Sequence, residues 1–251
     1  PVKDTIKVSP DGTRVAGTPN RSTLWAAQTP QCYRRGVLAH LLDAFPGALT
    51  EYDAKRFLAQ HGVPVTRERL VASREEALEA ARQIGYPVAL KVMSSRILHK
   101  TEAGALALGL GGEEALTNAY GRILESALRF APEGALQGVL VQEMVRDGFE
   151  CILGVKRDPL FGPLVAVGLG GIYVEILRDV SLRRAPFGVA TAREMLRELK
   201  GYPLLAGARG QKPRDVEALA ELVARVSRIA AAEPDLGELD LNPVFVGYAG
   251  Q

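Results

Sequence analysis

Two hydrophobic patterns alternate along most of this chain. Apolar residues recur at helical spacing in several stretches, and shorter apolar runs bounded by Gly, Pro and Asp separate these stretches. Thr50 and Ser73 are the clearest helix starts, because each is followed three residues later by an acid that completes a capping box. The predicted helices lie within Gln31–Phe45, Leu49–Val65, Ser73–Gly85, Glu113–Phe130, Ala190–Lys200 and Asp215–Ala232.

The shorter apolar runs predict strands in both halves of the chain. Turn residues such as Asp158-Pro159 divide the longest of them into consecutive strands, and Pro243 is expected to stop the ladder of the last one. The predicted strands lie within Arg69–Ala72, Tyr86–Leu108, Gly138–Val145, Phe149–Phe187 and Glu238–Val246.

This order of elements favours an α+β fold. The antiparallel cluster of strands after residue 149 and the lack of a G-x-G-x-x-G motif argue against a Rossmann fold. We therefore predict two α+β lobes, residues 49–145 and 146–251, preceded by an N-terminal arm or linker at 1–48.

Composition narrows the class of partner. The 251 residues are 47% hydrophobic and 24% charged, and 31 Lys and Arg nearly balance 29 Asp and Glu. The near balance gives no reason to expect nucleic acid or a membrane surface as partner, and no apolar run is long enough to cross a bilayer. Cys32 and Cys151 show neither disulfide nor metal-site spacing, which favours a reducing cytoplasm, and Cys151 is expected to be a small core residue.

The stretch from Tyr86 to Leu108 carries the most specific chemistry. An apolar run ends near Lys91, a polar loop with Ser94 and Ser95 follows, and His99 precedes a returning apolar run. A lysine supplies a point charge and a small-residue loop supplies backbone N–H groups, so together they can hold a polyphosphate. An imidazole beside that phosphate can act as a nucleophile. The alternative is a solvated lysine and a loop histidine without chemistry.

Acidic side chains form a second candidate site in the last strand. Glu238, Asp240 and Asn242 alternate with apolar residues and are expected on one face of the strand. Three oxygen-bearing side chains suit Mg²⁺, which binds a few protein oxygens together with substrate phosphates. The alternative is a solvated edge strand.

Further candidates are weaker when taken one at a time. In VQEMV, Glu143 to Val145 could present backbone groups to an adenine, with Met144 against the ring, or could simply end a core strand. Three charged residues on predicted strands or just after them could be ligands or ordinary surface charges: Glu150, Glu175 and Arg183.

Five ordered blocks together resemble a known family. They are YPVALKVMSSRILHKTEAGAL, VQEMV, GVKRDPLFGPLVAVGLGGIYVEILRDVSLRRAPF, YPLLAGARG and ELDLNPVF. They resemble the ATP-grasp domain of the NDP-forming acyl-CoA synthetases, which is similar to the beta subunit of ADP-forming acetyl-CoA synthetase and more distantly to succinyl-CoA synthetase. The resemblance implies two lobes that clamp ATP or ADP between them.

The resemblance also implies roles for individual residues. Lys91 would contact the nucleotide phosphates with Arg183 nearby, and His99 would carry the phosphoryl group. Glu143 to Val145 would form the adenine hinge. Asp240 and Asn242 would hold Mg²⁺, helped by Glu238 or Glu175. Such chemistry consists mainly of charge neutralisation and in-line positioning.

A partner is implied as well. In this family the CoA-binding part lies on a separate alpha-type subunit or in another part of a fused chain, so we expect a hetero-oligomer in which the partner meets the small carboxylic acid or acyl-CoA. One departure is Ala105, where the family usually has a second glycine. Together with the unusual N-terminal arm, it leaves open one alternative, a non-catalytic nucleotide-sensing module. A separate alternative is an ATP-grasp ligase that joins a carboxylate to an amine, in which His99 would have no assigned role.

Overall fold

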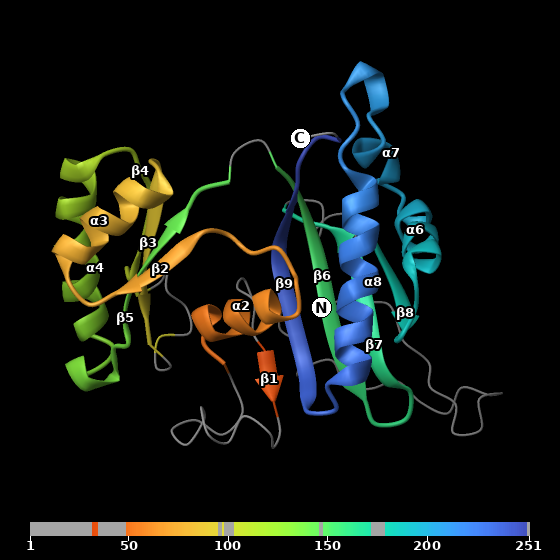
Figure 1. Cartoon of the computed structure of the whole chain (residues 1–251), viewed down its shortest axis with the longest axis horizontal. Helices are drawn as coiled ribbons and strands as arrows, with labels where there is room; N and C mark the ends of the chain where they lie inside the picture. The colour runs from red at the N-terminus through yellow and green to blue at the C-terminus, as the bar shows by residue number, and fades with distance from the viewer. Residues whose placement is uncertain are drawn as a thin grey trace.

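The computed structural model describes residues 32–34, 49–94, 97, 103–145, 148–171 and 179–249. Two antiparallel sheets organise this part of the chain, and each is covered by helices on one face (Figure 1). The α+β class with two lobes predicted from the sequence agrees with this architecture. Among the described helices, none is both long and apolar enough to span a bilayer.

The smaller sheet has the order β2-β5-β3-β4. Helices α3 and α4 pack on one of its faces, where Ala80 and Ile123 meet alternate residues of the strands. In β3 the core residues are Val88, Leu90 and Val92, so the residues between them point to the helix-free face. The elements are β2 (Glu68–Val71), α3 (Arg74–Ile84), β3 (Val88–Met93), β4 (Leu106–Leu110), α4 (Glu113–Leu128), a 3₁₀ turn η2 (Glu133–Ala135) and β5 (Gly138–Glu143).

The larger sheet has the order β1-β9-β6-β7-β8. Helices α6 and α8 cover one face, where Met195 and Val223 pack on Leu153 and Val165 of the central strands. The elements are β1 (Cys32–Arg34), β6 (Phe149–Asp158), β7 (Gly162–Leu169), β8 (Val180–Arg184), α6 (Val189–Glu198), α7 (Tyr202–Leu205), η3 (Ala208–Gly210), α8 (Val216–Ala232) and β9 (Leu236–Val246).

The predicted helix caps are present. The Thr50 side chain accepts a hydrogen bond from the backbone N–H of Asp53, and Ser73 accepts one from that of Glu76. Asp215 caps α8 in the same way through Ala218. These local signals set the helix starts, because each satisfies a backbone donor that has no partner within the helix.

Helix α2 (Glu51–Gln60) lies between the two sheets (Figure 1). Its apolar residues Ala54, Phe57 and Leu58 belong to the hydrophobic core of the larger sheet. The predicted first lobe, 49–145, groups this helix with the smaller sheet, but its core packing joins it to the larger one. The helical pattern predicts an apolar face on α2, but it does not tell which of the two sheets that face packs against.

Two local predictions were wrong. Cys32–Arg34 pairs with β9 as a strand and is not the start of a helix, whereas residues 35–48 lie outside the described part. Pro243 does not stop the β9 ladder, because pairing with β6 resumes at Val244. Two residues of β9, Asn242 and Pro243, oppose the single residue Ile152, so the proline sits in a bulge that needs no N–H donor from it.

Gly138, at the start of β5, provides a test of this fold. Its φ is 137°, and an added Cβ would lie 2.6 Å from the carbonyl oxygen of Val71. We expect Gly138→Ala to lower the free energy of unfolding by about 1–3 kcal/mol, measured by urea denaturation. The control is Gly121→Ala in α4, where nothing lies within 4 Å of the new Cβ; it should stabilise the protein by about 0.4–1 kcal/mol. Equal effects of the two substitutions would contradict this account of Gly138.

Candidate nucleotide site

Lys91 projects from β3 on the face of the smaller sheet opposite α3 and α4, where α2 approaches it. Its neighbours in the strand, Leu90 and Val92, point into the core under α3 and α4. The Lys91 side chain is 16% exposed, and its Nζ donates a hydrogen bond of 2.6 Å to Oε1 of Glu51. The predicted phosphate-binding lysine is therefore fixed by a carboxylate of α2.

The same carboxylate belongs to a buried group of charges. Lys55, one turn further along α2, donates from Nζ to Glu51 Oε1 at 3.1 Å and to Glu68 Oε2 at 2.8 Å. Two lysines and two glutamates balance in charge, as buried ions require. Burial raises the pKa of Glu68 above its ordinary value, and Lys55 opposes that effect. Sequence reasoning missed Glu51 and Lys55, because Glu and Lys at positions i and i+4 usually mark a solvated helix face.

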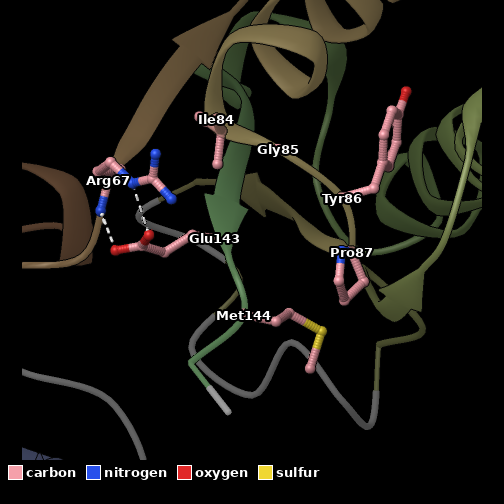
Figure 2. A pocket seen from close by; sticks show the side chains of 7 residues that line it. All are labelled: Arg67, Ile84, Gly85, Tyr86, Pro87, Glu143 and Met144. Atoms are coloured by element: carbon pink, nitrogen blue, oxygen red, sulfur yellow. Dashed lines mark hydrogen bonds and ion pairs between the residues drawn. The ribbon is translucent and has the colours of Figure 1, made fainter.

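The end of β5 is held by an arginine. Arg67 donates from its backbone N and from Nε to the two carboxylate oxygens of Glu143, each at 2.7 Å, and its carbonyl oxygen accepts from the Glu143 N–H at 2.9 Å. Figure 2 shows the two side chains turned toward one another. The carboxylate and the N–H of Glu143 are thus both engaged by Arg67, so a ligand at this strand end would have to use other main-chain groups of the segment.

Beside this ion pair lies a pocket of about 280 Å³ (Figure 2). Met144, directly after β5, lines it, and its Sδ accepts a hydrogen bond of 2.9 Å from the N–H of Gly109 in β4. Tyr86 and Pro87 line the side away from Arg67. Val145 follows and is 38% exposed. Val88 pairs with Glu143, so the predicted hinge lies three residues, about 10 Å, along β3 from Lys91.

The acidic residues of β9 lie on the helix-free face of the larger sheet. Glu238 and Asp240 alternate with the buried Leu239 and Leu241, as the sequence predicts, while Asn242 opens the bulge. Burial, together with the nearby charge of Glu238, raises the pKa of Asp240 to about 7.

These donors fit a hard cation. Burial and the nearby charge of Glu238 disfavour the charged form of Asp240, and a bound cation would offset that cost. Among the described residues, no three His, Cys, Asp or Glu side chains gather as a complete metal site. Asp240, Glu238 and the amide oxygen of Asn242 would hold Mg²⁺ together with further oxygens, such as those of a bound phosphate.

Other candidate residues are placed differently. Arg183 pairs with Val165, whose side chain is in the core, so it lies on the helix-covered face and binds Glu198 of α6. Arg184 pairs with Leu164 of β7, one position along from Arg183, and so lies on the helix-free face of the larger sheet. Glu150 lies opposite Phe245 on β9, and its carboxylate lies beside Gly171.

Ser94 is described and buried, directly after β3. Ser95, His99 and Glu175 lie outside the described residues. Cys151 is a buried core residue, as predicted, and burial raises its pKa to about 12.

Comparison with known proteins identifies the family. The family model for the ATP-grasp domain matches residues 41–251. The beta subunit of the ADP-forming acetate–CoA ligase I of Pyrococcus furiosus is 44% identical over 197 residues, covering 78% of this chain and 85% of that subunit. This chain belongs to the beta-subunit family of the ADP-forming acetyl-CoA synthetases. The resemblance inferred from the five sequence blocks is confirmed.

Solved structures of related synthetases have the same fold as this chain. An acetyl-coenzyme A synthetase of Ca. Korarchaeum cryptofilum, in complex with coenzyme A and Ca-AMPCP, superimposes with a TM-score of 0.78 at 42% identity, covering 84% of this chain and 92% of that one. A second structure of the same enzyme superimposes with a TM-score of 0.68 at 41% identity, covering 78% of this chain and 84% of that one. It contains Mg-AMPPCP and a phosphohistidine segment that points towards its nucleotide binding site.

The ion pair at the end of β5 leads to a test. Glu143→Gln should lower the free energy of unfolding by about 1–2 kcal/mol, because a neutral amide cannot accept two charge-assisted hydrogen bonds from Arg67. Arg67→Met should cost about 1 kcal/mol, since the bond from its backbone N–H survives. The double variant should cost less than the sum of the two, as measured by urea denaturation. Strict additivity would show that the two side chains do not act together.

Proposed function

We propose that this chain is the nucleotide-binding, beta-type subunit of an ADP-forming acyl-CoA synthetase, an acid–thiol ligase. With a CoA-binding alpha-type partner it interconverts acyl-CoA, phosphate and ADP with the carboxylic acid, CoA and ATP. Membership of the synthetase family supports the activity. The observation that carries the nucleotide role is the placement of Lys91 on the face of the smaller sheet opposite α3 and α4, three residues along β3 from the predicted hinge.

ATP lies between the sheets in this proposal. The adenine meets main-chain groups of the segment from Glu143 to Val145 other than the Glu143 N–H, which donates to Arg67, as the Glu143 carboxylate accepts from it. The phosphates meet Lys91, with backbone groups near Ser94 and Ser95 beyond it. Asp240, Glu238 and Asn242 hold Mg²⁺, which neutralises phosphate charge. Arg183 is bound to Glu198 on the helix-covered face of the larger sheet, so this proposal gives it no contact with the phosphates. Glu150 as a ligand contact and Glu175 as a helper of Mg²⁺ stay predictions from the sequence.

His99 carries the phosphoryl group in this proposal. A ring nitrogen attacks the γ-phosphorus of ATP, the bond to the β–γ bridging oxygen breaks, and ADP leaves while a phosphorus–nitrogen bond forms. The partner then receives the phosphoryl group. His99 is outside the described residues, so this step is supported by the ILHKT block and by the phosphohistidine segment of the Korarchaeum relative.

Phosphohistidine formation is directly testable. The chain is incubated with Mg²⁺ and ATP labelled at the γ-phosphate, with and without the alpha-type partner, and acid-labile, base-stable label on the protein is measured. We expect label on the unaltered chain and none on His99→Ala, with His61→Ala as the matched control that keeps its label. If the chain binds ATP but stays unlabelled with the partner present, the synthetase proposal is wrong and a nucleotide-sensing or amide-ligase role replaces it.

The metal role of Asp240 gives a second test. Asp240→Asn should raise the Mg²⁺ concentration for half-maximal labelling by about tenfold or more, because one anionic ligand is lost. Asp158→Asn is the control. This acid caps the β6–β7 turn by accepting from the N–H groups of Leu160 and Phe161, which an amide oxygen can also do. An unchanged Mg²⁺ dependence in Asp240→Asn would remove Asp240 from the metal site.

A further inference from the structure

One carboxylate oxygen joins the nucleotide lysine to the rest of the molecule. Glu51 Oε1 accepts from Lys91 Nζ at 2.6 Å and from Lys55 Nζ at 3.1 Å. The Glu51 side chain is only 2% exposed, so this contact is not a solvated surface pair. Charge-assisted hydrogen bonds of this length, away from water, restrict both partners strongly.

Glu51 is itself held from two sides. It lies in the first turn of α2, where Ala54, Phe57 and Leu58 anchor the helix in the core of the larger sheet. On the other side Lys55 ties the helix to Glu68 in β2 of the smaller sheet. The carboxylate that receives Lys91 is therefore fixed with respect to both sheets.

A phosphate-binding lysine benefits from such a partner. Its four-carbon side chain has many rotamers, and ordering them on binding lowers affinity. An ammonium has three donor hydrogens, and the bond to Glu51 uses one, so donors remain for anionic oxygens. Lys55 shares the charge of Glu51, which limits the extent to which this carboxylate competes with phosphate for Lys91.

We propose that Glu51 is the positioning residue of Lys91 and that nucleotide affinity depends on this contact. The proposal rests on the assignment of Lys91 to the nucleotide phosphates. It makes α2, which contributes no residue to the predicted hinge or metal site, part of nucleotide binding.

The test compares two substitutions in the same buried network. Glu51→Gln removes the charge that holds Lys91, whereas Lys55→Met leaves the contact between Glu51 and Lys91 in place. Affinity for Mg–ADP is measured by isothermal titration calorimetry on the full chain, with Lys91→Met as reference. The melting temperature of each variant without nucleotide is measured in parallel.

We expect Glu51→Gln to weaken Mg–ADP binding by about tenfold or more, and Lys55→Met by less than about threefold. A purely structural network predicts that affinity falls in both variants in step with stability, and that result would overturn the proposal. Glu51→Asp guards against misfolding of Glu51→Gln. It keeps the charge but withdraws it by one methylene, so its affinity should lie between those of Lys55→Met and Glu51→Gln; affinity equal to that of Lys55→Met would also overturn the proposal.

The two proposals fail in different ways. If Lys91→Met weakens Mg–ADP binding and Glu51→Gln does not, the nucleotide site stands and the positioning role is wrong. If the unaltered chain does not bind Mg–ADP, the nucleotide site itself is wrong, and the role of Glu51 is lost with it.

Discussion

The two-sided packing of α2 is the constraint on which the arrangement of this protein depends. Its apolar side completes the core of the larger sheet, while Glu51 and Lys55 face charged residues of the smaller one. Apolar contacts tolerate small displacements, but buried ions must meet partners at hydrogen-bond distance. The charged side of α2 therefore fixes where the smaller sheet, and Lys91 with it, lies against the rest of the molecule.

The two candidate sites differ in how their charge is balanced. Around Lys91, two lysines and two glutamates neutralise one another within the protein. Around Asp240 the nearest described charges are less well matched: Glu238 repels it, and Lys156 reaches Glu238 only at 3.9 Å. An Mg–nucleotide complex carries anionic oxygens and a cation at once, so it complements a lysine on one sheet and an acidic pair on the other.

Local features of this fold follow from the sequence more readily than long-range ones. The caps at Thr50 and Ser73 can be predicted because each needs only residues within one helical turn. The alternation of Asp240 with buried leucines follows from the period of a strand in the same way. The contact of α2 with the smaller sheet joins residues 40 positions apart, Glu51 and Lys91, and no local pattern encodes it. Arg183 shows a similar limit, since the facing of its side chain is set by its register with Val165.

The hinge shows how an engaged side chain can direct recognition to the backbone. The three hydrogen bonds between Arg67 and Glu143 fix the end of β5 to the segment before β2. Main-chain N–H and C=O groups at a fixed strand end have set directions, so they can distinguish the donor and acceptor edge of a base. If the Glu143 carboxylate were free to rotate, it could accept hydrogen bonds from the edges of several different bases, and it would distinguish them less well. In the proposed function, selectivity for the base therefore depends on how rigidly Arg67 holds this strand end. Substitutions at Arg67 should change the preference between nucleotides more than substitutions at Met144, because the Met144 sulfur is turned toward Gly109.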